Sequence, residues 1–458
     1  MNKNTNEGIY NVKELGAGKT IVLGLQHMFA MFGATVLVPL LTGLDVSTTL
    51  LFAGLGTLLF HLLTKMKVPA FLGSSFAFLG GYAAIAPKLA DGSSNTEMIP
   101  YACFGVACAG LVYLLLAGLI KIFSAKRVMK FFPPIVTGPI IIAIGLTLSK
   151  SAIDNCSSNW WVALAAIIVV IICNIWGKGM IKIVPILIGV VASYIVGVCM
   201  GEVDFTSVAE ASWVGLPIHK EATVLALFDG KLDTELLITS VITIVPIALA
   251  TIVEHVGDIS AISSTTGRNY IKDPGLHRTL MGDGLATTLA SLFGAPANTT
   301  YGENTGVLNL SKVYDPFVVR LAACFAILFS FCPKFSAVIQ TMPTATVGGI
   351  SLILYGMISA VGVRNIVETK VDFTKSRNVI IAALILVLAI GINYSAAGAI
   401  SFTIAKKITI SLSGLAVGAL TGIILNAILP GKDYVFDDDE PSDTGVNFQV
   451  GDRQKDKE

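Results

Sequence analysis

The stretch that decides the fold reads GAPANTTYGENTG, from Gly294 to Gly306. A proline near its start, β-branched threonines and several glycines make a continuous helix unfavourable here. The pattern predicts an extended segment that leads into a short helix. A second stretch of the same make-up runs from Pro69 to Phe78 and contains GSSFAF. Two such segments can hydrogen-bond to each other, and the helices that follow can point backbone N–H groups at a ligand.

The composition of the chain places these two segments in a membrane. The 458 residues are 54% hydrophobic and 13% charged, whereas soluble domains are about 25% charged. A bilayer core takes about 20 apolar residues per helix, so the chain has room for roughly 14 spans. This composition excludes soluble enzymes and secreted scaffolds, and the net charge of +1 predicts no nucleic-acid partner. Seven cysteines without CxxC spacing predict no disulfide, and we expect no metal and no cofactor.

The apolar runs predict an all-α multi-pass membrane protein with fourteen transmembrane segments. These segments are 20–41, 47–64, 69–86, 101–123, 133–149, 160–176, 181–200, 236–264, 277–293, 295–309, 315–332, 344–363, 378–393 and 409–429. The third and tenth are the interrupted ones, and short antiparallel β segments are expected in them. Basic residues such as Lys65 and Arg127 gather in the loops after even-numbered spans. Both termini are therefore predicted to be cytoplasmic, in a plasma or inner membrane.

An internal repeat relates the two halves of the chain. Gln26-His27 precedes Pro69-Ala70 by nearly the distance at which Glu254-His255 precedes Pro296-Ala297. Because seven spans per half is an odd number, the second copy would be inverted, which is typical of secondary transporters with a midplane site. Chance agreement of two dipeptide pairs is the alternative. The predicted parts are an N-terminal cytoplasmic tail (1–19), a first repeat (20–200), an extracellular loop (201–235), a second repeat (236–430) and a disordered acidic cytoplasmic tail (431–458).

Three carboxylates fall inside predicted spans, where ionisable groups are unfavourable and mark candidate functional sites. Glu254 and Asp258 are four residues apart and share one helix face. Both cannot ionise at low free energy, so one is expected to hold a proton near neutral pH, which makes the pair a candidate proton carrier. Glu303 offers an acceptor in the interrupted tenth span. The alternative is that either member of the pair is a structural partner of a backbone group or of His27.

Aromatic faces at Phe76 and Tyr301, beside these carboxylates and the backbone N–H groups, suit a flat, polar, uncharged heterocycle. Several runs then resemble the nucleobase-ascorbate transporter family, over nearly all of positions 20–430. These runs are QH (26–27), GSSFAF (73–78), EHVG (254–257), DPGLHR (273–278), NTTYGEN (298–304) and GGISLILYG (348–356).

The resemblance implies two inverted seven-span repeats divided into a core domain (spans 1–4 and 8–11) and a gate domain (spans 5–7 and 12–14). It also implies a homodimer formed through the gate domains, and proton-coupled uptake of uracil by alternating access. The substrate-binding residues that it implies are Ala34, Ser75, Phe76, Glu254, Tyr301, Gly302, Glu303 and Tyr355. Proton coupling would involve Asp258, Glu254 and Glu303, with His27, Asn304 and Ser351 in support.

Asp258 departs from the family pattern for uracil. The uracil-transporting member that this chain resembles has histidine at this position, whereas purine-transporting relatives often have aspartate. Those purine relatives usually have glutamine at the position of Glu303, so uracil is the expected substrate and a proton-coupled xanthine or urate symporter is the alternative. An anion exchanger of similar fold is a more distant alternative, and the three carboxylates argue against it. A membrane enzyme would need a nucleophile–base pair that the sequence does not offer.

Overall fold

The computed structural model describes residues 8–89, 93–229, 232–405, 408–432 and 434, without the side chains of Ile183, Glu303 and residues 402–411. The predicted acidic tail lies outside the described residues from 435 onward. The helices are α1 Ala17–Thr42, α2 Val46–Leu63, α3 Leu79–Ile85, α4 Ile99–Phe123, α5 Ala125–Val128, α6 Pro134–Cys156, α7 Trp160–Trp176, α8 Met180–Ile183, α9 Pro185–Cys199, α10 Thr206–Glu210, α11 Thr234–Ile244, α12 Ala248–Thr266, α13 Leu276–Leu292, α14 Gly302–Ser311, α15 Pro316–Ser330, α16 Pro333–Gln340, α17 Thr344–Glu368, α18 Ser376–Asn393 and α19 Gly414–Ile428. The strands are β1 Leu72–Ser74, β2 Asn298–Thr300, β3 Ala399–Ala405 and β4 Ile408–Ser413.

Seven of the described helical stretches are long and apolar enough to cross a membrane. They are α1, α2, α4, α6, the combined stretch Thr234–Thr266, α17 and α18. The pair α15 and α16 would add an eighth if it is one span, bent by 86° at its break. The apolar helices α7, α9 and α19 have fewer than the 18 residues of a full membrane-spanning helix. The protein is therefore a multi-pass membrane protein, and the count of fourteen spans stays a prediction.

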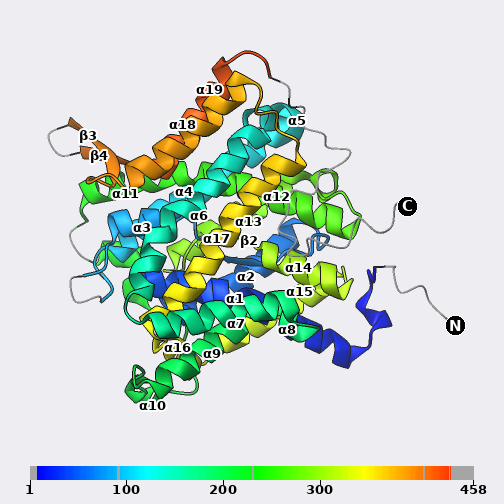
Figure 1. The fold of residues 1–458 in the computed structure, drawn as a ribbon, viewed down its shortest axis with the longest axis vertical. Coiled ribbons are helices and arrows are strands. Elements are labelled where there is room, and N and C mark those ends of the chain that lie inside the picture. The colour runs from blue at the N-terminus through cyan, green and yellow to red at the C-terminus, as the bar shows by residue number, and fades with distance from the viewer. Residues whose placement is uncertain (1–7, 90–92, 230–231, 406–407, 433, 435–458) are drawn as a thin grey trace.

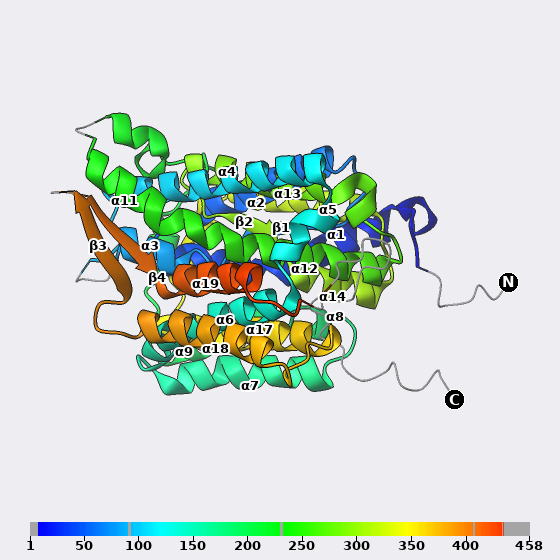
Figure 2. The same cartoon turned by 90° about the horizontal axis from the view of Figure 1, so that it is seen from above.

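The helices lie in layers around the first strand pair. Figure 2 shows α2, α4 and α13 on one side and α6, α17, α18 and α7 on the other, with β1, β2 and α12 between them. Figure 1 shows α6 and α17 lying together near the centre of the molecule. These two helices approach so closely that a Cβ atom on Gly145 of α6 would lie 2.2 Å from the carbonyl oxygen of Tyr355 in α17. Glycine at this position lets the two backbones touch.

A β-hairpin replaces the start of the predicted fourteenth span. β3 and β4 pair antiparallel from Ala399↔Ser413 to Ala405↔Ile408, and α19 begins only at Gly414. The prediction that residues 409–413 are helical is therefore wrong. The run ITIS, which starts at Ile408, begins with three consecutive β-branched residues, which favour a strand. Hydropathy counts these residues as apolar and cannot distinguish a strand from a helix.

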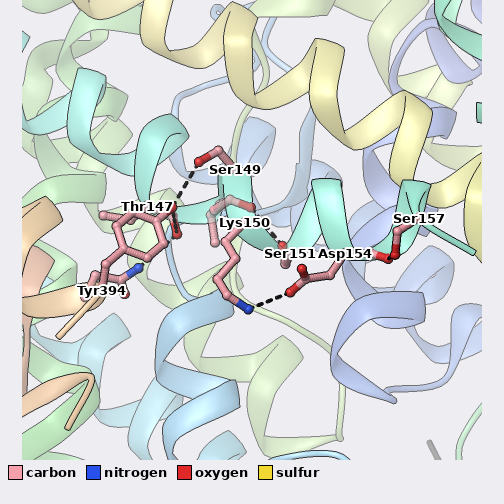
Figure 3. Close-up of polar contacts among 9 residues, drawn as sticks. Thr147, Ser149, Lys150, Ser151, Asp154, Ser157 and Tyr394 are labelled. Carbon is pink, nitrogen blue, oxygen red and sulfur yellow. Dashed lines mark hydrogen bonds and ion pairs between the residues drawn. The ribbon is translucent and has the colours of Figure 1, made fainter. Parts of the chain in front are cut away.

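The C-terminal end of α18 and the residue after it are tied to the middle of α6, as Figure 3 shows for Tyr394. The hydroxyl of Tyr394 donates to the carbonyl of Leu146 at 2.8 Å, and the side-chain amide of Asn393 donates to the carbonyl of Thr147 at 3.0 Å. Beside them, Lys150 and Asp154 form an ion pair at 2.7 Å on an exposed surface. A fully exposed ion pair adds little to stability, so the hydrogen bonds of Tyr394 and Asn393 to α6 are the contacts that hold this junction.

Candidate functional site

The strand pair β1–β2 brings the two interrupted segments together. The strands are antiparallel, with Leu72 opposite Thr300, Gly73 opposite Thr299 and Ser74 opposite Asn298. Two flanking backbone bonds extend the ladder: Ser75 donates to Ala297 at 2.8 Å, and Tyr301 donates to Phe71 at 3.1 Å. Such pairing satisfies backbone groups that a helix would otherwise satisfy in a medium without water. The prolines and glycines that prevent a helix here thus yield a paired backbone.

Side chains from neighbouring helices fix the strand pair. The amide of Asn298 donates to the carbonyl of Phe52 in α2 at 2.9 Å, and Thr57 of α2 accepts from the backbone N–H of Leu72 at 2.9 Å. On the β1 side, the hydroxyl of Ser74 donates to the carbonyl of Thr35 in α1 at 3.0 Å. All of these groups are buried. The strands are therefore held from both flanks by fully buried hydrogen bonds.

Glycine is required where the strand pair meets its surroundings. A Cβ atom on Gly73 would lie 2.5 Å from the ring of Tyr301 and 2.7 Å from the hydroxyl of Thr35. A Cβ atom on Gly56 of α2 would lie 2.2 Å from the amide nitrogen of Asn298. Both positions have room for a hydrogen atom and none for a methyl group, so each glycine lets a side chain pack directly on the backbone.

A cavity of about 60 Å³ lies against β2, between α12 and the helix pair α6–α17. It is lined by Phe76, Ile141, Glu254, Gly257, Asp258, Thr299, Thr300, Tyr301, Gly302, Leu354, Met357, Ile358 and Val361. One water needs about 10–15 Å³ measured in this way, so the cavity has room for several waters or for part of a small flat molecule. Its wall is apolar on the α6 and α17 side and polar on the α12 and β2 side.

The polar wall contains the two carboxylates of α12. Asp258 is 7% exposed, and its Oδ2 atom accepts a hydrogen bond from the hydroxyl of Thr300 at 2.7 Å. Glu254, one turn earlier, lines the same cavity. On the opposite side Phe76 meets Tyr355 edge-on, with ring centroids 5.9 Å apart. An aromatic face, two carboxylates and the first residue of α14, Gly302, thus surround one space.

Five of the predicted site residues line this cavity together: Phe76, Glu254, Asp258, Tyr301 and Gly302. Glu303 is the second residue of α14, but its side chain lies outside the described part of the structure. Among the described side chains, the other predicted residues are buried without lining the cavity. These residues are His27 and Ala34 in α1, Ser75 after β1, Asn304 in α14, and Ser351 and Tyr355 in α17.

Several residues of the cavity wall were not predicted from the sequence. Leu354, Met357, Ile358 and Val361 lie on one face of α17, at the spacing of a helical stripe that periodicity could have revealed. Thr299 and Thr300 stand directly beside Tyr301, and the hydroxyl of Thr299 is buried with no hydrogen-bond partner in the described structure. A buried hydroxyl in this state is available to a ligand.

A further carboxylate, Asp283, is fully buried in the predicted ninth span and was also missed. Its Oδ2 atom is 2.9 Å from Nδ1 of His255, and both side chains are 0% exposed. His255 follows Glu254 in α12, and Asp283 belongs to α13. The pair therefore joins the helix that carries the site carboxylates to the layer behind it. Among the described residues, no three His, Cys, Asp or Glu side chains converge as metal ligands would.

Comparisons with known proteins show what this chain is similar to. A family model described as the permease family matches residues 18–398. The uracil permease of Bacillus caldolyticus is 41% identical over 426 residues, covering 91% of this chain and 93% of that protein. The uracil permease of Escherichia coli K12 is 36% identical over 424 residues, covering 90% of this chain and 91% of that protein.

Two solved structures share the fold at low identity. The transmembrane domain of the cyanobacterial bicarbonate transporter BicA superposes with a TM-score of 0.58 at 17% identity, covering 85% of this chain and 99% of that one. The structure of SLC26A9 superposes with a TM-score of 0.62 at 12% identity, covering 92% of this chain and 66% of that one. Similarity at this level concerns the arrangement of helices alone.

Proposed function

The chain belongs to the permease family of nucleobase-ascorbate transporters, and from this membership we propose that it carries uracil across the cytoplasmic membrane in symport with protons. Curated relatives named uracil permease cover most of this chain at 36–41% identity, which supports uracil as the substrate. Permeases move their substrate without changing it chemically, so this assignment is that of a transporter rather than an enzyme. It requires no cofactor.

One observation carries the proposal: Phe76 and the two carboxylates of α12 face a single small cavity at the strand pair. Uracil is a flat ring whose edge alternates N–H donors and carbonyl acceptors. The ring would lie on Phe76, Glu254 would accept from a ring N–H, and the backbone N–H groups in the first turn of α14, from Gly302 onward, would donate to a carbonyl. We assign Glu303 the role of a second carboxylate acceptor for the substrate.

Proton coupling is assigned to Asp258 together with Glu254 and Glu303. Glu254 and Asp258 lie one helical turn apart and line the same cavity, so a proton shared between them would relieve like-charge repulsion. Protonation from an acidic outside would neutralise the site and favour uracil entry. Release of the proton inside would then favour uracil release, so an inward proton gradient would drive accumulation.

Alternating access would move the two cavity walls apart. The polar wall belongs to β2 and α12, in the proposed core domain, and the apolar wall belongs to α6 and α17, in the proposed gate domain. We assign the homodimer contact to the gate domain and both termini to the cytoplasm. Ala34, Ser75, Tyr355, His27, Asn304 and Ser351 would support the site from behind its lining.

The test is uptake of radiolabelled uracil, xanthine and sulfate by cells that lack their own carriers. We expect saturable uracil uptake that a protonophore abolishes. The variant Glu303→Gln should bind uracil ten- to a hundredfold more weakly, since a charge-assisted hydrogen bond contributes about 1.5–3 kcal/mol. The matched control is Asp154→Asn, on the exposed end of α6. Xanthine uptake that exceeds uracil uptake would favour the purine alternative, and sulfate uptake would favour an anion exchanger.

A further inference from the structure

The contact between Thr300 and Asp258 joins the two elements that form the polar wall of the cavity. The hydroxyl of Thr300, in β2, donates to Oδ2 of Asp258, in α12, at 2.7 Å. Both side chains are buried, at 2% and 7% exposure. We infer that Thr300 is the positioning residue for proton exchange, which holds Asp258 against β2 while its carboxylate is ionised. The assignment of the exchanged proton to Asp258 rests on the proposed function.

The chemistry of the two groups gives this contact a charge preference. An ionised carboxylate can only accept hydrogen bonds, so it needs a donor such as the Thr300 hydroxyl. A hydrogen bond to the charged form favours that form. Protonation of Asp258 takes one proton from the aqueous phase and breaks no other covalent bond. Protonation weakens the hydrogen bond that the carboxylate accepts from the Thr300 hydroxyl. The charge of Asp258 therefore governs how firmly α12 is held against β2.

The strand carries this effect to the ligand. Thr300 is paired with Leu72 of β1 and is followed by Tyr301 and Gly302, which line the cavity. Its neighbour Thr299 contributes a buried hydroxyl to the cavity without a partner in the described structure. A change at Asp258 therefore reaches the substrate position within two residues of β2.

The charged groups around Asp258 belong to α12 itself and to the elements packed against it. Glu254 lies on the same helix, and Asp283 of α13 is already paired with His255. Tyr113 of α4 donates its hydroxyl to Thr251, and the acidic residue that α14 contributes is Glu303, whose side chain lies outside the described part. Three more elements pack against α12. Helix α6 carries Lys150 and Asp154 at its exposed end, and the short helix η6 (Ile271–Gly275) carries Lys272 and Asp273. The sequence of α19 holds no charged residue.

The decisive experiment needs no ligand. The thermal unfolding midpoint of the purified full chain in detergent is measured from pH 5 to pH 9 for wild type, Thr300→Val and Thr300→Ser. Valine has the shape of threonine without the hydroxyl, so its loss of stability should grow as pH rises and Asp258 ionises. Serine keeps the hydroxyl and should restore the wild-type pH profile. In an Asp258→Asn background, Thr300→Val should leave the pH dependence unchanged. An equal loss at every pH would mean simple packing and would overturn the inference.

Uracil binding then tests the link to transport. Because loss of this hydrogen bond favours the protonated carboxyl, the upper pH limit of uracil binding should move to higher pH in Thr300→Val. An unchanged limit alongside an altered unfolding profile would overturn the role of Thr300 in proton exchange. Absence of uracil binding by the wild type would instead remove the proposed function, while the ligand-free profiles would still decide whether Thr300 holds ionised Asp258.

Discussion

The hydroxyl of Tyr301 donates a hydrogen bond to the backbone carbonyl of Ser74 at 2.7 Å, across a sequence separation of 227 residues. This bond joins the residue after β2 to the last residue of β1, beside the cavity. Its donor also lines that cavity with its ring. The same side chain thus fixes the strand pair and shapes the proposed substrate position.

Tyr301→Phe keeps the ring and removes this bond. The free energy of unfolding should fall by about 0.5–1.5 kcal/mol, the typical net value of one hydrogen bond, with a further loss if the Ser74 carbonyl stays unpaired. Uracil affinity should fall severalfold, since the strand pair that carries the site is less firmly held. Thermal unfolding with and without uracil measures both. Affinity equal to wild type would show that the bond serves the fold alone.

Gly73→Ala should abolish uracil binding. Its methyl group would lie 2.5 Å from the Tyr301 ring, so the ring or the strand must shift. The matched control is Gly80→Ala in α3, where a Cβ atom meets nothing within 4 Å and alanine favours the helix. Equilibrium binding of labelled uracil to both purified variants compares them. Full binding by Gly73→Ala would show that the Tyr301 ring is not held in place.

Asp258→Asn should separate binding from accumulation. The change removes one of two neighbouring charges, so Glu254 should ionise more readily and uracil should still exchange. Accumulation against a gradient should be lost. Counterflow in proteoliposomes without a pH gradient measures the first process, and uptake with an imposed gradient measures the second. Loss of counterflow would make Asp258 a binding or structural residue, whereas retention of both would place the proton on Glu254 or Glu303.

Asp283→Leu should destabilise the protein by about 1–3 kcal/mol, because it leaves the buried ring nitrogen of His255 without its polar partner. Replacing both residues with leucine removes the buried pair as a whole and should recover much of that loss. The unfolding midpoints of the two single variants and the double variant form the test. A double variant with the summed loss of both singles would mean that His255 and Asp283 act independently.

Uridine should compete poorly with uracil. The cavity is about 60 Å³ and is lined by Leu354 and Met357 on the α17 side, so a ribose attached to the ring would meet this wall. Ribose attachment also removes one ring N–H that a carboxylate would accept. Competition assays with unlabelled uridine and uracil measure the difference. Equal inhibition would indicate a roomier site that takes nucleosides.

The sequence predicted the elements around the site better than their contacts. Proline and glycine content located both strand segments, and helical spacing placed Glu254 with Asp258. The hairpin β3–β4 was missed because hydropathy treats an apolar strand and an apolar helix alike. The bond from Thr300 to Asp258 joins residues 42 positions apart on different elements. Its geometry depends on how β2 crosses α12, which no local pattern encodes.

The pairing of β1 with β2 also constrains how the protein is made. After Ser74 has been synthesised, the ribosome must add another 227 residues before Tyr301 exists to bond with it. Until then β1 sits in the nascent chain without its partner strand. Neither half of the polypeptide can therefore mature alone, and two separately expressed halves would become a working carrier only by finding each other in the bilayer.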